Sequence, residues 1–425
     1  MTKPYTVLMG KTVRAIARLR GGGSALPGLF VEKIDKSFVS DALGQLSHGV
    51  IVISGTNGKT TTTKMVVALL ESQGLRVFTN RTGSNFVRGV AAALLSDVDT
   101  RGRLDADIAV LELDEAHAVH FVDRIAPRYS LLLNVMRDQL DRFGEIDHTA
   151  ALLQHIASKT TDCVVINRDD PRLSSSTFVH DVDARIATFG VSKALLRQFP
   201  SDDELRGPSQ KQKQHIVQKD DTTLVEMTGS TATISYAGSS KKVSLKINGI
   251  YNVLNAVGAV ALCRQIMGDA LNEQKMLAAL SEVTPAFGRG ESFVINGQPL
   301  QLVLVKNPSG FRLGLQSFSP KNYETMIAIN DNYADGRDMS WLWDIDFDSL
   351  HDGVAEVSGI RAYDMALRLQ YDEVPVSHVE VNLSKSLERF LSNHAQQPKR
   401  IYCTYTAMLA LRRELAKITS IEEVL

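Results

Sequence analysis

Two kinds of hydrophobic pattern alternate along the chain from residue 49 onward. Short apolar runs rich in β-branched residues predict strands, and the helix-length segments between them predict helices. Strands that alternate with helices imply a mainly parallel sheet covered on both faces, so the predicted fold class is α/β. The first predicted strands are Val50–Ile53, Val77–Thr79, Ile108–Leu113, Ser130–Val135 and Val164–Asn167, and the first predicted helix after residue 49 is Thr60–Ser72.

The alternation is interrupted in the middle of the chain. Residues 197–221 are polar and carry no apolar period, so we expect an exposed insertion or long loop there. Residues 223–248 predict short antiparallel strands, and residues 248–267 predict a helix. A second alternating region follows, and we place a domain boundary at residues 296–297. Its predicted strands are Leu302–Val305, Met326–Ile329 and Ile401–Thr404.

The first 48 residues are distinctive in charge. Apolar residues return at helical spacing through residues 7–19, which predicts a basic amphipathic helix. Two interpretations stay open: the helix packs on its own domain, or it forms a surface for an anionic membrane or substrate. We expect an N-terminal basic helical segment (1–48), a central domain (49–296) and a smaller C-terminal domain (297–425). The basic residues that precede the first acidic residue, Glu32, are Lys3, Lys11, Arg14, Arg18 and Arg20.

Composition narrows the class of protein. The 425 residues include 47 Lys and Arg against 48 Asp and Glu, a balance that argues against a protein that coats nucleic acid. No apolar run reaches the ~18 residues of a membrane span, and no signal-peptide pattern is present, so we expect a cytoplasmic protein without a transmembrane segment. Cys163, Cys263 and Cys403 stand alone in apolar stretches, which predicts core residues and neither a disulfide framework nor a four-cysteine zinc site.

Residues 50–63, VIVISGTNGKTTTT, carry the strongest chemical signal. A β-branched strand runs into the sequence GTNGKT, and a predicted helix follows. Glycines let backbone N–H groups wrap a phosphate, and a helix N-terminus adds its dipole. Lys59 would neutralise phosphate charge, and the Thr60 hydroxyl would ligate Mg²⁺. Because Ile53 stands where a strict Walker A loop has glycine, this is a shorter relative of that loop.

Residues 108–115, IAVLELDE, form a predicted strand that ends in carboxylates. A Walker B motif places an acidic residue at such a strand end to hold Mg²⁺. Strand alternation puts Glu112 and Asp114 on the same face, so spacing alone leaves both as candidates.

Three further motifs offer chemistry. Residues 134–147, NVMRDQLDRFGEID, follow a predicted strand, at the edge where a parallel sheet binds ligands. Asn252 and Asn255 lie at a helix start, where they either cap the helix or read a base through amide hydrogen bonds. Arg289 lies between two glycines in FGRGE, a turn suited to phosphate contact.

Residues 330–356 are strongly acidic and contain both tryptophans of the chain, Trp341 and Trp343. Such a run is either a solvated face or a surface for a partner. The tryptophans favour the second interpretation, because aromatic residues are enriched at interfaces.

The motifs GTNGKT, ELDEA, NVMRDQLDRFGEID, GIYNVLN and FGRGE resemble, in this order, those of Mur ligases, the ATP-dependent amide-bond-forming enzymes of peptidoglycan synthesis. LVKNPSGF and NDNYADGRDMSWLWDIDF resemble, more specifically, the MurT family, the synthetase subunits of lipid II isoglutaminyl synthase. The resemblance implies a Mur ligase-like P-loop domain and a Rossmann-like C-terminal domain. It also implies a heterodimer with a GatD-like glutaminase, which amidates the D-glutamate α-carboxylate of lipid II at the inner membrane face.

The resemblance further implies roles for individual residues, with ATP and Mg²⁺ as cofactors and no zinc. Thr60 and Glu112 would hold Mg²⁺, and Asn255 would contact adenine. Arg289 would meet the γ-phosphate. Asp338 would complete the Cys–His pair of the partner glutaminase. The residues expected around the ATP phosphates are Gly55, Thr56, Asn57, Gly58, Lys59, Thr60 and Thr61.

Three departures from the wider Mur pattern refine this expectation. Only residues 1–48 precede the phosphate-loop strand, which fits a lipid-linked substrate better than a soluble UDP-linked precursor. The cysteines cannot form the zinc ribbon of many MurT-like proteins, and residues 197–221 stand in its place. Gln139 occupies a position where many Mur ligases have a metal-binding His and MurT-like proteins have Gln. No carbamoylated lysine of the Mur type can be identified.

Other interpretations stay open. A folylpolyglutamate-type or poly-γ-glutamate-type ligase shares the phosphate loop but has no reason for the ADGRDMSW segment, and a nucleotide-dependent scaffold would make no acyl phosphate. Asp338 could instead cap a helix that follows it. Asp335 and Asp344 are its nearest rivals for the role in the partner.

Overall fold

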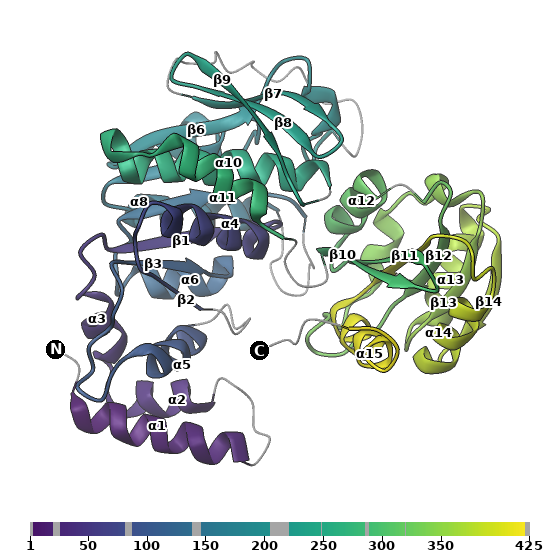
Figure 1. Ribbon diagram of the computed structural model, residues 1–425, viewed down its shortest axis with the longest axis horizontal. Helices are drawn as coiled ribbons and strands as arrows, with labels where there is room; N and C mark the ends of the chain where they lie inside the picture. The colour runs from purple at the N-terminus through teal and green to yellow at the C-terminus, as the bar shows by residue number, and fades with distance from the viewer. Residues whose placement is uncertain are drawn as a thin grey trace.

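The computed structural model describes residues 3–19, 26–80, 87–137, 146–204, 221–247, 249–284, 289–318 and 320–420. Figure 1 shows two units side by side, each built on a sheet with helices around it. The larger unit comes from the earlier part of the chain, and the smaller unit, drawn in green to yellow, comes from the C-terminal part. The N-terminal helices lie at one end of the larger unit, below its sheet in the view of Figure 1.

The larger sheet has the order β2-β3-β1-β4-β5-β6-β7-β8-β9 in the described residues. Strands β2 to β7 are parallel, and β8 and β9 add an antiparallel edge. Ile53 of β1 pairs with Glu112 of β3 and Leu131 of β4, so three strand ends meet at one edge. The strands are β1 (Val50–Ser54), β2 (Val77–Thr79), β3 (Ile108–Glu112), β4 (Tyr129–Leu132), β5 (Cys163–Asn167), β6 (Arg185–Val191), β7 (Thr222–Thr228), β8 (Thr231–Tyr236) and β9 (Ser239–Ser244).

Helices cover both faces of this sheet, because alternate residues of each strand point to opposite sides. Ile51 and Ile53 join the core formed with α4, α10 and α11, whereas Val50 and Val52 join the core formed with α5, α6 and α8. Burial on both faces explains why the parallel strands are almost wholly apolar. The helices are α4 (Lys59–Ser72), α5 (Val87–Asp97), α6 (Glu115–Val122), α8 (Ile146–Lys159), α9 (Ser176–His180), α10 (Ile250–Met267) and α11 (Glu273–Glu282), with the short turns η1 (Leu196–Gln198) and η2 (Gly268–Ala270).

Helix α10 is the most apolar long helix of this unit. One helical stretch in the described residues, Ile250–Ala270, is long and apolar enough to cross a membrane, but 61% of its apolar 18-residue window is buried inside the fold. Residues 253–263 are all buried, and they pack with α4 and the sheet. The helix is apolar on every side because it is a core helix.

The smaller sheet has the order β10-β11-β15-β12-β13-β14. All of its neighbouring strands are parallel except the β10–β11 hairpin. The boundary expected at residues 296–297 falls in the turn of this hairpin, so the second sheet already begins at Arg289. The elements are β10 (Arg289–Ile295), β11 (Gln298–Leu304), α12 (Pro308–Ser317), β12 (Glu324–Ala328), η3 (Ser340–Asp344), η4 (Asp348–Leu350), β13 (Val354–Ser358), α13 (Ala362–Tyr371), β14 (Val376–Glu380), α14 (Leu383–Ser392), β15 (Lys399–Cys403) and α15 (Tyr405–Leu415).

Three N-terminal helices, α1 (Pro4–Leu19), α2 (Leu26–Ile34) and α3 (Phe38–Leu43), pack beside α5. The helix predicted over residues 7–19 is thereby confirmed. A Cβ added at Gly10 of α1 would lie 2.7 Å from the side chains of both Leu95 and Val31. The absence of a side chain at this position lets α1 approach its neighbours closely.

The strands and helices predicted in the first subsection are confirmed, with shifts of a few residues at their ends. The exposed loop expected at residues 197–221 is wrong in its first part. Phe199 is buried and packs edge-on against Tyr251, with ring centroids 5.5 Å apart. Asp202 is buried as well, and it accepts the Arg137 N–H at 3.1 Å. Residues 205–220 lie outside the described residues.

Candidate active site

The predicted phosphate loop is the connection between β1 and α4. Gly55 and Gly58 have φ angles of 130° and 91°, in the region that favours glycine. A Cβ at Gly58 would also lie 2.4 Å from Nδ2 of Asn255. Position 58 therefore requires glycine for two independent reasons. Because α4 begins at Lys59, its free N–H groups point at the loop.

Asn255 is the residue of α10 that approaches the phosphate loop. Its side chain is buried, and together with Asn252 it lines the same groove as Asn57 and Gly58. The N-cap residue of α10 is Gly249, so neither asparagine occupies the N-cap position. The structure places Asn255 beside the loop, and its contact with adenine stays a prediction.

Lys59 and Thr60 face carboxylates from the end of β3 and the start of α6. The Lys59 Nζ donates to the Gly55 carbonyl at 2.6 Å and lies 3.2 Å from both carboxylate oxygens of Glu115. Both side chains of this ion pair are buried. The Thr60 hydroxyl donates to Glu112 Oε1 at 2.8 Å. Hydroxyl and carboxylate oxygens are the ligands that Mg²⁺ prefers, so Thr60 and Glu112 fit the predicted metal site.

Of the two carboxylates that spacing left open, Glu112 is the one that reaches Thr60. Asn80, just after β2, holds the Glu112 backbone: its Nδ2 donates to the Glu112 carbonyl at 2.8 Å, and its Oδ1 accepts the Glu112 N–H at 3.0 Å. Asp114 instead occupies the N-cap position of α6. Thr61, in the first turn of α4, has a buried hydroxyl without a hydrogen-bond partner in the described structure.

The segment after β4 holds the phosphate loop in shape. Asn134 Oδ1 accepts the Asn57 N–H at 2.9 Å, and Asn134 Nδ2 donates to the Asn57 carbonyl at 3.0 Å. The Thr56 hydroxyl donates to the Met136 carbonyl at 3.1 Å and accepts the Met136 N–H at 3.0 Å. These two reciprocal pairs fix the loop backbone before any ligand binds.

Asp170 supports this segment from the loop after β5. Its carboxylate accepts the N–H groups of Val135 at 2.7 Å, Arg172 at 3.0 Å and Leu173 at 3.1 Å. Burial raises the pKa of Asp170 to about 6. The backbone that braces the phosphate loop is therefore held by one buried carboxyl group, whose charged form is disfavoured by its burial.

The smaller unit supplies the opposite wall of the groove. Ser309, at the start of α12, donates to the Arg137 carbonyl at 2.6 Å, across the two units. In the same turn of α12, Phe311 packs edge-on against Trp341 with 6.5 Å between ring centroids, and the Arg312 side chain donates to the Asp344 carbonyl. The residues that line this wall include Val303, Leu304, Gly310, Leu313, Gly314, Ser317 and Phe318.

Two predicted site residues lie at the limits of the described structure. Arg289 begins β10, where its backbone is paired with Val303, a residue of the groove wall. This backbone position is compatible with a role for Arg289 at the groove. Gln139 belongs to residues 138–145, which lie outside the described residues.

Asp338 follows β12 in a surface segment of the smaller unit. It is half-buried, and its Oδ1 accepts the Ser340 N–H at 2.8 Å at the start of η3. Hydrogen bonds from the Ser340 hydroxyl and backbone N–H lower the pKa of Asp338. Asp338 therefore lies one residue before Met339, the N-cap of η3, and holds the first N–H of that short 3₁₀ turn. Its lowered pKa means that it is ionised at neutral pH.

The rival Asp335 is buried and has structural partners. Its carboxylate accepts the Thr406 N–H at 2.7 Å and the Asn332 N–H at 3.1 Å, which ties two loops together. Trp341, expected at an interface, is buried against the core of the smaller unit, so that expectation is wrong. Trp343 is the exposed tryptophan.

Trp343 belongs to an exposed apolar surface on α13, which we call the α13 patch. Tyr363, Leu367 and Tyr371 return every fourth residue and therefore share one face of the helix. All three are exposed, and Trp343 packs edge-on against Tyr371 with 5.1 Å between ring centroids. Clustered apolar side chains of this kind mark interaction sites.

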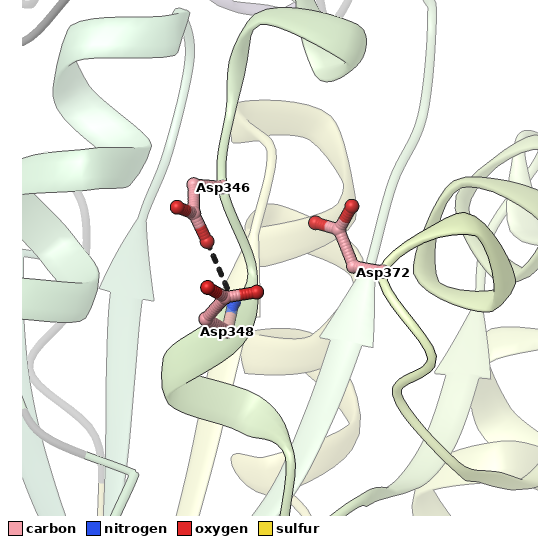
Figure 2. Close-up of side chains that lie close together, drawn as sticks. All are labelled: Asp346, Asp348 and Asp372. Carbon is pink, nitrogen blue, oxygen red and sulfur yellow. Dashed lines mark hydrogen bonds between the residues drawn. The ribbon is translucent and has the colours of Figure 1, made fainter.

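Figure 2 shows a nearby group of carboxylates, Asp346, Asp348 and Asp372, whose oxygens could approach a metal ion. Asp346 and Asp372 make hydrogen bonds that explain their positions, and Asp348 is exposed. Asp346 accepts the Asp348 N–H at 2.8 Å, and Asp372 accepts the Phe347 N–H at 2.9 Å and pairs with Arg368. The group therefore organises the turn around η4, and no metal role is assigned to it.

The cysteines lie in three different elements, β5, α10 and β15. All three are buried, which confirms the prediction that they are core residues. Burial raises the pKa of the Cys163 thiol to about 11 and that of the Cys263 thiol to about 12. It raises the pKa of Cys403 further still. The thiols therefore stay protonated and unreactive at neutral pH.

Comparison with known proteins agrees with this geometry. Residues 53–263 match the Mur ligase middle domain, and residues 304–408 match the MurT ligase C-terminal family. The lipid II isoglutaminyl synthase (glutamine-hydrolyzing) subunit MurT of Streptococcus pneumoniae is 30% identical, with 96% of each chain covered. Its Staphylococcus aureus (strain COL) counterpart is 29% identical, with 87% of each chain covered. The structure of MurF ligase from Thermotoga maritima in complex with ADP matches with a TM-score of 0.66 at 16% identity, covering 90% of this chain and 84% of that one.

The fold and the phosphate-loop site thus define a Mur ligase-like, ATP-dependent ligase. Within that class, the chain belongs to the MurT family, whose curated members are named as subunits of lipid II isoglutaminyl synthase.

Sequence reasoning missed three residues of the site. Glu115 was part of the ELDE run, but only the structure pairs it with Lys59. Asn134 was part of a charged motif, yet its role is to brace the phosphate loop. Ser309 lies in LVKNPSGF, a segment noted only as a resemblance, and its contact with Arg137 spans 172 positions of sequence.

Proposed function

We propose that this chain amidates the α-carboxylate of D-glutamate in the lipid II stem peptide, with ammonia from a glutaminase partner, at the cytoplasmic face of the membrane. The observation that carries the proposal is the Thr60–Glu112 pair beside Lys59, in a groove whose other wall belongs to the MurT-type C-terminal region. The two MurT relatives are named as subunits of a glutamine-hydrolysing lipid II isoglutaminyl synthase, which supports both the substrate and the nitrogen donor.

The loop would cradle the ATP phosphates with its backbone N–H groups and Lys59. Thr60 and Glu112 would hold Mg²⁺, which when bound supplies positive charge to the phosphoryl oxygens. Asn255 would contact adenine from the start of α10, and Arg289 would approach the γ-phosphate from the start of β10. The phosphate-binding residues are Gly55, Thr56, Asn57, Gly58, Lys59, Thr60 and Thr61.

The proposed chemistry has two steps. A substrate carboxylate oxygen attacks the γ-phosphorus of ATP, and the bond between this phosphorus and the β,γ-bridging oxygen breaks. ADP departs, and the substrate now carries an acyl phosphate. Ammonia then attacks the acyl carbon, the C–O bond to phosphate breaks, and the amide forms with release of phosphate and a proton. Lys59 stabilises the negative charge that moves during the first step. No nucleophilic side chain of this chain takes part.

Ammonia would come from a GatD-like glutaminase in a heterodimer with this chain. A glutaminase cysteine needs a histidine base, and a carboxylate fixes the tautomer of that histidine and stabilises its positive charge. Asp338 is ionised and near the surface, so it can serve this role in the partner's active site. Asp335 is less suited because it is buried and bonded to Thr406 and Asn332.

The α13 patch is the surface that we propose for the partner. The patch lies next to the segment that carries Asp338. Trp343 belongs to η3, which begins two residues after Asp338, and its ring packs on Tyr371 of α13. Replacing Leu367 by Ser is expected to weaken the heterodimer while leaving ATP binding unchanged. A variant that assembles as tightly as the original protein would exclude the patch.

The decisive experiment uses the assembled complex with ATP and lipid II, followed by mass spectrometry of the stem peptide. The expected product is one amide at the D-glutamate α-carboxylate, formed with glutamine or with added ammonium. Hydroxylamine should trap the acyl phosphate as a hydroxamate.

The same experiment separates the alternatives. Attachment of an amino acid in place of ammonia would indicate a ligase of the folylpolyglutamate type. Nucleotide binding without any hydroxamate would indicate a scaffold.

A further inference from the structure

Glu115 places a second buried carboxylate beside a loop that is expected to bind negative phosphates. It is the first residue of α6, and only 1% of it is exposed. Glu112 already faces the Thr60 hydroxyl, so the proposed metal site does not require Glu115. The Glu115 carboxylate instead contacts Lys59, with both of its oxygens 3.2 Å from Nζ. The two proposed chemical steps leave this negative charge without a role.

The contacts of Lys59 occupy its ammonium group. An ammonium group has three N–H donors. The Lys59 Nζ meets at least three acceptors, the Gly55 carbonyl at 2.6 Å and the two Glu115 oxygens at 3.2 Å. A phosphate oxygen can therefore bind this ammonium only by displacing an acceptor. The Gly55 carbonyl belongs to the loop backbone, whereas the Glu115 carboxylate ends a side chain that can rotate, so the carboxylate is the acceptor that yields.

The charge of Glu115 opposes a bound phosphate in either arrangement of Lys59. If Lys59 stays with Glu115, its positive charge is already neutralised when the phosphate arrives. If Lys59 turns to the phosphate, Glu115 is left buried without its partner, which is costly. Both side chains of the pair are buried, so solvent screens these charges poorly.

We propose that Glu115 is a positioning residue that competes with the nucleotide phosphates for Lys59. It holds the ammonium at the loop before ATP binds, and it takes the ammonium back after phosphoryl transfer, so that ADP leaves readily. This inference rests on the proposed function because it takes ATP as the nucleotide. It adds a role for Glu115 in binding and release that the chemical steps do not supply.

The test is the variant Glu115→Gln, which keeps the shape of the side chain and removes its charge. Binding of ADP and ATP is measured by calorimetry, both with Mg²⁺ and with a chelator, so that any effect of the carboxylate on the metal is separated. Glu115→Asp keeps the charge. Glu356→Gln is the matched control, because Glu356 is also 1% exposed and pairs with Arg389 on β13 of the smaller unit (Figure 1).

Glu115→Gln should bind ADP and ATP at least about tenfold more tightly, with and without Mg²⁺, because the phosphates then supply the missing counter-charge of Lys59. Dissociation of ADP should slow by a similar factor, since changes in affinity appear mostly in the dissociation rate. Glu115→Asp should bind as the original protein does. Glu356→Gln should lose stability, as Glu115→Gln does, but its affinity for ADP should be unchanged.

Unchanged or weaker binding by Glu115→Gln would overturn the proposal, and so would equal tightening in Glu115→Asp or Glu356→Gln. Dissociation of ADP is also measured on protein prepared with ADP, so a variant that unfolds without nucleotide still gives a result. If the original protein binds no ATP, the proposed function fails together with this inference. If it binds ATP and Glu115→Gln binds no more tightly, only the role of Glu115 is removed.

Discussion

The ammonium group of Lys59 is shared between the Gly55 carbonyl, at 2.6 Å, and both carboxylate oxygens of Glu115, at 3.2 Å. The pair is buried, so each charge depends on the other. The lysine expected to meet phosphate is thus held at the loop by a carboxylate from the neighbouring strand connection. Lys59 is therefore expected to contribute both to the free energy of unfolding and to the rate of the proposed reaction. Variants of Lys59 and Glu115 can measure the two contributions separately.

Lys59→Ala is expected to lower the rate of amidation by roughly 10²-fold or more, because the transferring charge loses its stabilising partner. It should also lower the free energy of unfolding by about 3–5 kcal/mol, since Glu115 is left buried and unpaired. The measurements are turnover at saturating ATP and chemical denaturation. Near-normal turnover would contradict the phosphate-loop assignment.

The double variant Lys59→Ala, Glu115→Ala is expected to recover much of the lost stability, because no uncompensated charge remains. It should recover no activity. A double-mutant cycle on the free energy of unfolding gives the coupling between the two residues. A coupling close to zero would show that the pair does not stabilise the fold.

Gly58→Ala is expected to abolish ATP binding, because the new Cβ would lie 2.4 Å from Asn255 Nδ2 and displace the loop. Gly74→Ala is the matched control. Both glycines have φ near +91°, but nothing lies within 4 Å of a Cβ at Gly74. The control should lose about 1 kcal/mol of stability and keep its ATP affinity, as measured by calorimetry. Equal loss of ATP affinity in both variants would refute the role of Asn255.

Asp338→Asn is expected to abolish glutamine hydrolysis by the complex while leaving assembly and ammonium-supported amidation largely intact. Asp346→Asn is the matched control, since Asp346 accepts a backbone N–H two residues on at 2.8 Å, as Asp338 does. The control should hydrolyse glutamine normally. The role of Asp338 in the partner is wrong if both variants behave alike, or if ammonium does not restore amidation.

The raised pKa of Asp170 predicts that its contribution to the free energy of unfolding falls as the pH rises. Its pKa is about 6 in the folded protein, above the ~3.9 of an unfolded chain, so the folded state holds the proton more tightly. The stability that this group contributes is present below about pH 4 and is lost as the pH rises through about 6. The free energy of unfolding relative to Asp170→Asn should therefore fall by up to about 3 kcal/mol over that range. A difference that is flat or increases with pH would contradict the raised pKa.

The sequence predicted the features that depend on residues close to one another in the chain. The β1–α4 phosphate loop followed from glycines between a β-branched strand and a helix, and α1 followed from its apolar spacing. Burial of the cysteines followed from their apolar neighbours.

The parts that failed depend on contacts between distant segments. Trp341 was expected at an interface because aromatic residues are enriched at interfaces and this one lies in an acidic run, yet it packs against Phe311 of α12. Phe199 and Asp202 were assigned to an exposed insertion because their neighbours are polar, yet each is buried by a residue far away in the chain. Glu112 could be separated from Asp114 only by the position of Thr60, which no spacing rule contains.

Helix α12 links the two ends of the proposed reaction. Its first turn bonds to the Arg137 carbonyl beside the phosphate loop, and Phe311 and Arg312 contact Trp341 and Asp344, in the turn that follows Asp338. These contacts lie within four consecutive residues, 309–312, so a single turn of α12 touches both the segment beside the phosphate loop and the surface segment that carries Asp338. Because interiors are close-packed, this turn cannot shift toward one segment without changing its contacts with the other.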